Sequence, residues 1–175
     1  MKETKMEVKY IIGHWTAGMH KPNKLDKQSY QLLIDDEGNL YKGMAVGCAS
    51  SIGGMNSITY NIACCGGLSS SMLTKVQIEK FFKTCAEKLK EYNLTPDKFY
   101  THAEIGEMTR AYDLKRKGKV YDHRYGLITD LLTYNGYLLQ NIGKIDLTVT
   151  PYLSGNAKAT GDFIRNKIRW YYEKL

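Results

Sequence analysis

Runs of apolar residues, separated by turn-forming residues, divide the chain into short strands with helices between them. Four runs are rich in β-branched, aromatic and aliphatic residues and predict strands at 8–12, 30–35, 57–65 and 99–101. Residues 36–39 are a turn signal, and 40–42 return as the hairpin partner of the second strand. Strands mixed with helices in this order predict one α/β domain with a central mixed β-sheet flanked by helices.

Two segments show the periodicity of an amphipathic helix. In the first, Thr74 and Gln77 form a capping box, and Pro96 follows the expected end of the helix. Its apolar face consists of Ile78, Phe81, Phe82, Cys85, Leu89 and Tyr92. The second helix is expected at about 162–173. At 127–132 the pattern does not distinguish a helix from a strand.

Length and hydropathy limit where the protein can act. The 175 residues suit a single domain, and no apolar run approaches the roughly 20 residues of a membrane span, so we expect no membrane insertion. Residues 1–9 alternate charged and polar side chains and lack the apolar core of a signal peptide. We therefore expect the protein to be cytoplasmic on synthesis.

Charge and cysteine content narrow the partners only slightly. The net charge of +7 favours an acidic partner, either nucleic acid, an anionic membrane surface or a wall polymer. No nucleic-acid-binding motif is present, so we expect no nucleic acid partner, and we interpret the basic run 115–119 as a solvated loop. The four cysteines form no C-x-x-C motif, and we expect reduced, mostly buried thiols.

Two histidines occupy the same setting, each directly after a predicted strand. His14 follows the strand at 8–12, and His102 follows the strand at 99–101. Neighbouring strand ends can direct both imidazoles into one cleft, although a lone histidine in this position is more often structural. A catalytic zinc takes three protein ligands and keeps one open position, and Asp146 could supply the third.

Lys144 lies two residues before Asp146, so in an extended segment both side chains face the same side. A lysine beside a metal site is well placed to stabilise a developing oxyanion. The alternative interpretation of Lys144 and Asp146 is an exposed ion pair that contributes little to stability.

Four motifs in a fixed order add a family resemblance. The segments GHWTAG at 13–18, YQLLIDDEGNLY at 30–41, THAE at 101–104 and GKIDLT at 143–148 together resemble the type 2 N-acetylmuramoyl-L-alanine amidase family. That family includes phage endolysins and peptidoglycan recognition proteins. Each motif alone is weak, but the set in this order is fairly specific. The similarity extends from about residue 8 to residue 151.

The resemblance implies a Zn²⁺ ion held by three residues, His14, His102 and Asp146. It also implies that Lys144 is the catalytic lysine two residues before the third ligand. Tyr30 matches a position where some members place a catalytic tyrosine, although it could instead pack on the sheet edge. Glu104 matches the acidic residue two positions after the second histidine, and we interpret it as a partner of the catalytic site rather than a general base.

The chain departs from the family in one place. The segment between His102 and the expected third ligand is long and contains three other candidate ligands, Asp122, His123 and Asp130. We favour Asp146 because it brings Lys144 with it. Residues 110–137 are then an insertion that we expect to border the substrate groove, within a single amidase domain spanning 1–175.

The resemblance implies a zinc hydrolase that cuts the amide bond between N-acetylmuramic acid and L-alanine in bacterial peptidoglycan. We expect a monomeric, phage-type lysin that degrades the cell wall after release. The main alternative is a non-catalytic module that binds peptidoglycan. A zinc deaminase is disfavoured, because the H-x-E triplet at 102–104 is not followed by P-C-x-x-C.

Overall fold

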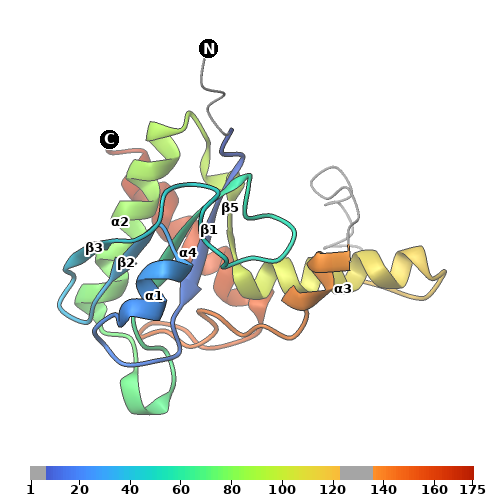
Figure 1. The fold of residues 1–175 in the computed structure, drawn as a ribbon, viewed down its shortest axis with the longest axis horizontal. Coiled ribbons are helices and arrows are strands. Elements are labelled where there is room, and N and C mark those ends of the chain that lie inside the picture. The colour runs from blue at the N-terminus through green and yellow to red at the C-terminus, as the bar shows by residue number, and fades with distance from the viewer. Residues whose placement is uncertain (1–6, 123–135) are drawn as a thin grey trace.

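The computed structural model describes residues 7–122 and 136–175. Within them, five strands form one mixed sheet in the order β3-β2-β4-β1-β5 (Figure 1). The strands are β1 (Tyr10–Trp15), β2 (Leu32–Ile34), β3 (Leu40–Lys42), β4 (Thr59–Cys64) and β5 (Phe99–Thr101). Only β3 pairs in the antiparallel sense, with β2, and the other neighbours are parallel. The predicted α/β fold with a mixed sheet is confirmed.

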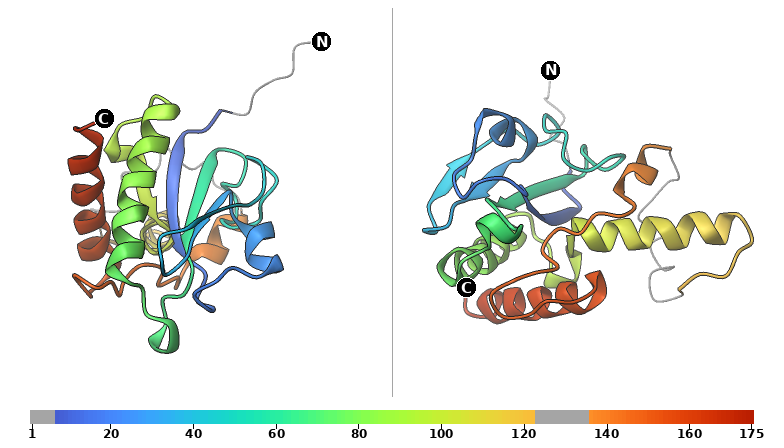
Figure 2. Two further views of the ribbon diagram at one scale, coloured as in Figure 1. Left: turned by 90° about the vertical axis from the view of Figure 1, so that its left-hand side faces the viewer. Right: turned by 90° about the horizontal axis from the view of Figure 1, so that it is seen from below.

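The main helices lie on both sides of this sheet. They are α1 (Lys24–Ser29), α2 (Lys75–Glu91), α3 (His102–Arg116) and α4 (Ala157–Tyr172), with short 3₁₀ turns η1 (Ser69–Ser71), η2 (Pro96–Lys98) and η4 (Gly136–Asn141). Helices α2 and α4 lie side by side and cover one face of the sheet (Figure 2). A second apolar cluster on the other face joins β1 to α3, η4 and the loop before β4.

The capping box of α2 also ties the helix to the sheet. Thr74 Oγ1 accepts from the backbone N–H of Gln77, and Gln77 Oε1 accepts from the N–H of Thr74. The Gln77 amide nitrogen then donates to the carbonyl oxygens of Ile34 and Cys65, just where β2 and β4 end. The predicted apolar face of the helix is buried against the sheet, with Tyr92 only half-buried.

Strand β1 is longer than predicted because Gly13 does not end it. A Cβ atom at Gly13 would lie 2.7 Å from the ring of Phe99 and 2.8 Å from the ring of Phe81. The glycine therefore permits two aromatic rings to approach the strand backbone, and the strand continues through His14 to Trp15.

Two helix starts differ from the prediction. Helix α4 begins at Ala157 rather than near 162, because the side chain of Asn156 caps it by accepting from the N–H of Ala159. Helix α1 was not predicted, although Asn23 and Asp26 form a capping box in front of it.

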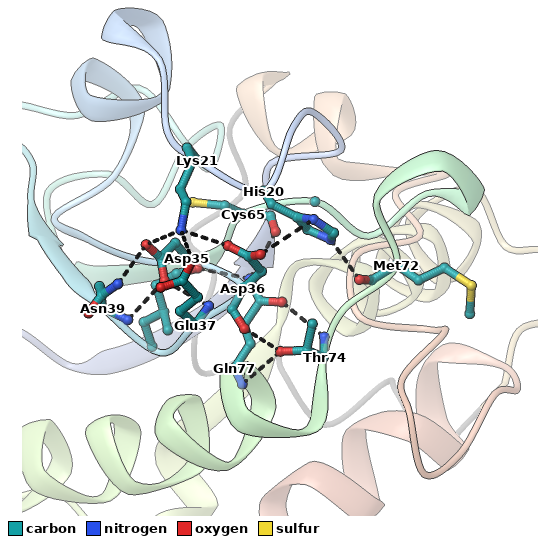
Figure 3. Close-up of polar contacts among 12 residues, drawn as sticks. His20, Lys21, Asp35, Asp36, Glu37, Asn39, Cys65, Met72, Thr74 and Gln77 are labelled. Carbon is teal, nitrogen blue, oxygen red and sulfur yellow. Dashed lines mark hydrogen bonds and ion pairs between the residues drawn. The ribbon is translucent and has the colours of Figure 1, made fainter.

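A polar cluster fixes the loop that leaves β1 (Figure 3). The ammonium group of Lys21 lies 2.9 Å from a carboxylate oxygen of Asp35, 2.9 Å from one of Asp36 and 3.2 Å from one of Glu37. Burial by itself raises the pKa of Asp35, but the Lys21 ammonium and three hydrogen bonds from Asn39 and Tyr41 outweigh it and hold the pKa well below its usual range. The β2–β3 turn thereby anchors the segment that follows His14.

The cysteines follow the expected pattern. Cys64, Cys65 and Cys85 are buried, Cys48 is exposed, and all four are free thiols. Among the described residues, no helix has the length and apolar character that crossing a membrane requires.

Candidate metal and catalytic site

Three side chains from distant parts of the chain meet at one edge of the sheet. His14 lies near the carboxyl end of β1, and His102 is the first residue of α3, directly after the neighbouring parallel strand β5. Asp146 lies in the loop between η4 and α4. All three residues are buried, and one ligand atom from each lies within 4.8 Å of the others.

The donor atoms fit a zinc ion. Nδ1 of His14 lies 3.7 Å from Oδ2 of Asp146, and Nδ1 of His102 lies 3.8 Å from Oδ1 of the same carboxylate. Both separations exceed hydrogen-bond length, and Nδ1 of His14 is buried without any hydrogen-bond partner. Two imidazole nitrogens and a carboxylate oxygen are a common ligand set for catalytic zinc.

The surroundings of His102 and Asp146 favour the protonation states that a metal needs. Burial lowers the pKa of His102 to about 4, with a further contribution from the neighbouring His14. Burial alone raises the pKa of Asp146, but the two histidines and the N–H of Trp15 outweigh it and lower the pKa. At neutral pH, His102 is therefore neutral and Asp146 is ionised, as metal binding requires.

Asp146 is presented by a turn, not by an extended segment. The N–H of Trp15 donates to Asp146 Oδ2 at 3.2 Å, and the N–H of Thr148 donates to the carbonyl oxygen of Ile145. Leu147 has a φ of 62°, an uncommon conformation for this residue, and its fully buried side chain joins the main core. The segment is therefore not extended, yet Lys144 and Asp146 still face the same cleft.

The cleft beside the three ligands has a volume of about 380 Å³. Its wall includes His102, Asp146, Tyr30 and Lys144, together with Trp15, Thr16, Ala17, Ser29, Ser50, Ser51, Gly143 and Ile145. A second, smaller polar pocket shares Ser50, Ser51, His102 and Lys144 with it. The cleft gives a substrate access to His102 and Asp146, which form part of its wall.

Two side chains in this cleft can donate to an anionic oxygen. The ring of Tyr30 lies 5.0 Å from that of His14, and burial followed by the charge of Asp146 raises the pKa of its hydroxyl, which stays protonated. Lys144 is exposed and forms no ion pair with any residue in the described ranges, Asp146 included. The ion-pair interpretation of Lys144 therefore finds no support.

Glu104 lies apart from the cleft. Its carboxylate caps α3 by accepting from the N–H of Thr101 at 3.0 Å, and it pairs with Arg165 of α4 at 2.6 Å. Burial raises the pKa of Glu104 to about 7, and the Arg165 guanidinium and the Thr101 N–H keep it from rising further. Glu104 therefore joins α3 to α4 and does not form part of the candidate site.

We expect Arg165→Met to destabilise the fold by about 3 kcal/mol, because it leaves a buried carboxylate without its charge partner. In this variant the folded-state pKa of Glu104 would rise further above the unfolded value of about 4.3. Between the unfolded and the folded pKa, only the folded state holds the proton on Glu104, so the stability of the variant falls as the pH rises. Urea unfolding at pH 5 and pH 8 should give the larger deficit at pH 8. An equal deficit at both would contradict this account.

Within the described part of the chain, no other candidate third ligand lies at the site. Asp122 is exposed after α3 and does not belong to the cluster. His123 and Asp130 lie outside the described residues, as does the rest of 123–135 within the predicted insertion at 110–137. The first part of that insertion continues α3 to Arg116. The prediction that this insertion borders the groove stays a prediction.

Two asparagines that the sequence analysis missed contact the ligands. Nε2 of His14 lies 2.8 Å from Oδ1 of Asn61, and Nε2 of His102 lies 2.8 Å from Oδ1 of Asn141. Both asparagines are about 1% exposed. Asn61 could have been noticed as an amide residue in the middle of a predicted strand, whereas nothing in the sequence near Asn141 marks it.

Helix α3 passes so close to Asn141 that only glycine fits at position 106. A Cβ atom at Gly106 would lie 2.2 Å from the carbonyl oxygen of Asn141. We expect Gly106→Ala to displace Asn141, to destabilise the fold by about 1–3 kcal/mol, and to weaken metal binding. Gly155→Ala is the control, because its Cβ would meet only the Cβ of Ala159, at 3.6 Å. Unchanged stability in the Gly106→Ala protein would contradict the packing.

The fold and the three converging side chains define an α/β domain with a cleft where parallel strands end, beside residues that could hold a metal ion. A model of the N-acetylmuramoyl-L-alanine amidase family matches residues 4–124, and the chain belongs to this family. The match contains His14, Tyr30 and His102 but ends before Lys144 and Asp146. The positions of these last two residues rest on the geometry.

One solved structure supports this fold, and a second matches a shorter part of the chain. The Staphylococcus aureus hydrolase AmiA, in complex with its ligand, is 13% identical with a TM-score of 0.51, over 95% of this chain and 73% of that chain. The N-acetylmuramoyl-L-alanine amidase LysC from Clostridium intestinale is 20% identical with a TM-score of 0.48, and the match covers 55% of this chain and 70% of that chain. No curated protein sequence matches the chain. At these identities, the similarity to AmiA shows the fold alone.

Proposed function

We propose that this protein is a zinc-dependent amidase that hydrolyses the bond between N-acetylmuramic acid and L-alanine in bacterial peptidoglycan. One observation carries the proposal: two histidines and an aspartate converge, with Nδ1 of His14 buried and unpartnered. Lys144 lines the cleft beside them. The membership in the amidase family supplies the substrate class.

The chain's own residues account for the steps around the metal. When bound, zinc activates a water molecule and polarises the scissile carbonyl. The carbonyl oxygen gains negative charge as its carbon becomes tetrahedral, and hydrogen-bond donors directed at it can stabilise this charge. The Lys144 ammonium has no ion-pair partner among the described residues, and the Tyr30 hydroxyl remains protonated. Both face the cleft and can donate to this oxygen.

The setting of the reaction is also proposed. A monomer made in the cytoplasm, of the phage lysin type, would reach the wall after release. The net charge of +7 favours its association with the anionic polymers of a bacterial wall.

Product analysis tests the reaction. Purified peptidoglycan is digested with the protein, with chelator, and with chelator followed by zinc, and the new chain ends are identified by mass spectrometry. We expect free L-alanine amino termini that disappear with chelator and return with zinc. New reducing sugar ends would show a glycosidase and overturn the proposal. Stoichiometric zinc without cleavage of any peptidoglycan tested would indicate a binding module instead.

Removing the metal should leave the fold intact but less stable, because the two apolar clusters do not depend on the ligands. At a free zinc concentration of 100 Kd, binding stabilises the folded state by about 2.7 kcal/mol. For a chain of this length that raises Tm by about 5–10 °C. Calorimetry of the metal-free protein with and without zinc measures the shift. No shift in the wild type, or an equal shift in His14→Ala, would contradict the assigned site.

A further inference from the structure

The two candidate histidine ligands are each held from behind by an asparagine. Their Nδ1 atoms face Asp146, and their Nε2 atoms lie 2.8 Å from the side-chain oxygens of Asn61 and Asn141. A neutral imidazole carries an N–H on one ring nitrogen and a lone pair on the other. If an amide oxygen faces Nε2, then Nε2 must carry the proton and Nδ1 has the lone pair. The orientation of the two asparagine amides therefore determines the tautomer of each histidine.

The orientation of the Asn61 amide follows from its neighbours. Its nitrogen lies 3.0 Å from Oε1 of Gln31 and 3.0 Å from Oγ1 of Thr59. The Thr59 hydroxyl donates its only proton to the carbonyl oxygen of Met55, at 2.8 Å, so it can only accept a hydrogen bond from Asn61. The nitrogen of the Asn61 amide is therefore the donor to these two groups, and Oδ1 faces His14.

The Gln31 amide is fixed in turn by backbone groups, whose polarity is invariant. Its Oε1 accepts from the backbone N–H of Asn61 at 2.7 Å, and its Nε2 donates to the carbonyl oxygen of Ala45 at 3.2 Å. The backbone groups thus fix the donor and the acceptor in every hydrogen bond of this network, up to His14. Because Oδ1 of Asn61 can only accept, Nε2 of His14 must donate, and the lone pair remains on Nδ1, the atom that has no hydrogen-bond partner.

The second asparagine is fixed more directly. The nitrogen of the Asn141 amide lies 2.9 Å from the carbonyl oxygen of Gly53 and 3.0 Å from that of Leu138. Two carbonyl oxygens can only accept, so the nitrogen donates to both. The Asn141 oxygen must then accept from Nε2–H of His102, which again leaves the lone pair on Nδ1.

We propose that Asn61 and Asn141 are positioning residues that hold His14 and His102 in the Nε2–H tautomer, so that both present an Nδ1 lone pair to the metal. The inference rests on the proposed function only in naming zinc as that metal. Without its acceptor, the Nε2–H group would be buried unsatisfied, and the ring could rotate or move its proton to Nδ1. Replacing such a hydrogen-bond partner of a metal-binding histidine typically lowers the metal affinity by about 10–100-fold.

The tautomers can be read in the metal-free wild-type protein. Long-range ¹H–¹⁵N correlation spectra of histidine-labelled protein, recorded at pH 8, distinguish Nε2–H from Nδ1–H rings. We expect the Nε2–H pattern at both His14 and His102. The Nδ1–H pattern at either would overturn the inference. No substitution is involved, so this measurement decides the matter even where a variant fails to fold.

Two leucine variants test the consequence for metal binding. We expect Asn61→Leu to disturb the spectrum of His14 but not that of His102, and Asn141→Leu to do the converse. Each should lower zinc affinity by about 10–100-fold in competition with a chromophoric chelator. Asn156→Ala is the matched control, since it removes the cap of α4 and costs stability without touching either histidine.

The outcomes separate this inference from the proposed amidase activity. Wild-type zinc affinity in both leucine variants would overturn the inference, as would an equal loss in Asn156→Ala. The expected spectra and crossed effects in a protein that binds zinc but leaves peptidoglycan intact would support the inference while contradicting the proposed reaction.

Discussion

His14→Ala is expected to abolish stoichiometric zinc binding and to lower amidase activity by more than about 10²-fold. Losing only an outer hydrogen-bond partner of a ligand already costs up to that factor, and this substitution removes the ligand itself. His102→Ala should behave in the same way, because its Nδ1 faces the other oxygen of Asp146. Metal content by mass spectrometry and peptidoglycan hydrolysis measure both effects.

His20→Ala is the control for these variants. His20 lies in the loop between β1 and α1, and its Nε2 contacts the carbonyl oxygen of Met72, away from the three ligands. It should retain one zinc per chain and full activity. Retention of zinc by either His14→Ala or His102→Ala, with unchanged activity, would refute the site.

Lys144→Met is expected to separate chemistry from metal binding. The variant should keep one zinc per chain and lose about 10²–10³ in kcat, the usual cost of removing one donor to a developing oxyanion. The folded structure should be unaffected, because Lys144 is exposed and forms no ion pair with the described residues.

Lys83→Met provides the matched control for Lys144. Lys83 is an exposed lysine on α2, a helix that covers the sheet and does not line the cleft. The same charge change there should leave kcat unchanged, so a general effect of net charge on wall binding would appear in both variants. Full activity of Lys144→Met would remove the lysine from the mechanism.

The placement of the two histidines could be predicted because it depends on local patterns. The apolar runs before His14 and His102 identify two strands, and the carboxyl ends of neighbouring parallel strands meet at one sheet edge. The position of the α2 helix was predictable for the same reason, since its capping box and apolar face lie within one segment.

The remaining parts of the site depend on contacts between distant residues. Asp146 reaches the histidines through a turn in which Leu147 takes a left-handed conformation, which no propensity favours. Glu104 matched a family position, but its burial beside Arg165, 61 residues away, places its carboxylate elsewhere. The contacts of Asn61 and Asn141 with the histidines likewise form only in the folded structure, between residues 47 and 39 positions apart in the sequence.

Zinc titration of activity tests the central claim most directly. The protein is stripped of metal, reloaded with measured amounts of zinc, and assayed for release of L-alanine amino termini from peptidoglycan. The account predicts no activity without metal and a linear rise that stops at one zinc per chain. Full activity in the stripped protein, or a rise that continues well past one equivalent, would contradict a single zinc centre formed by His14, His102 and Asp146.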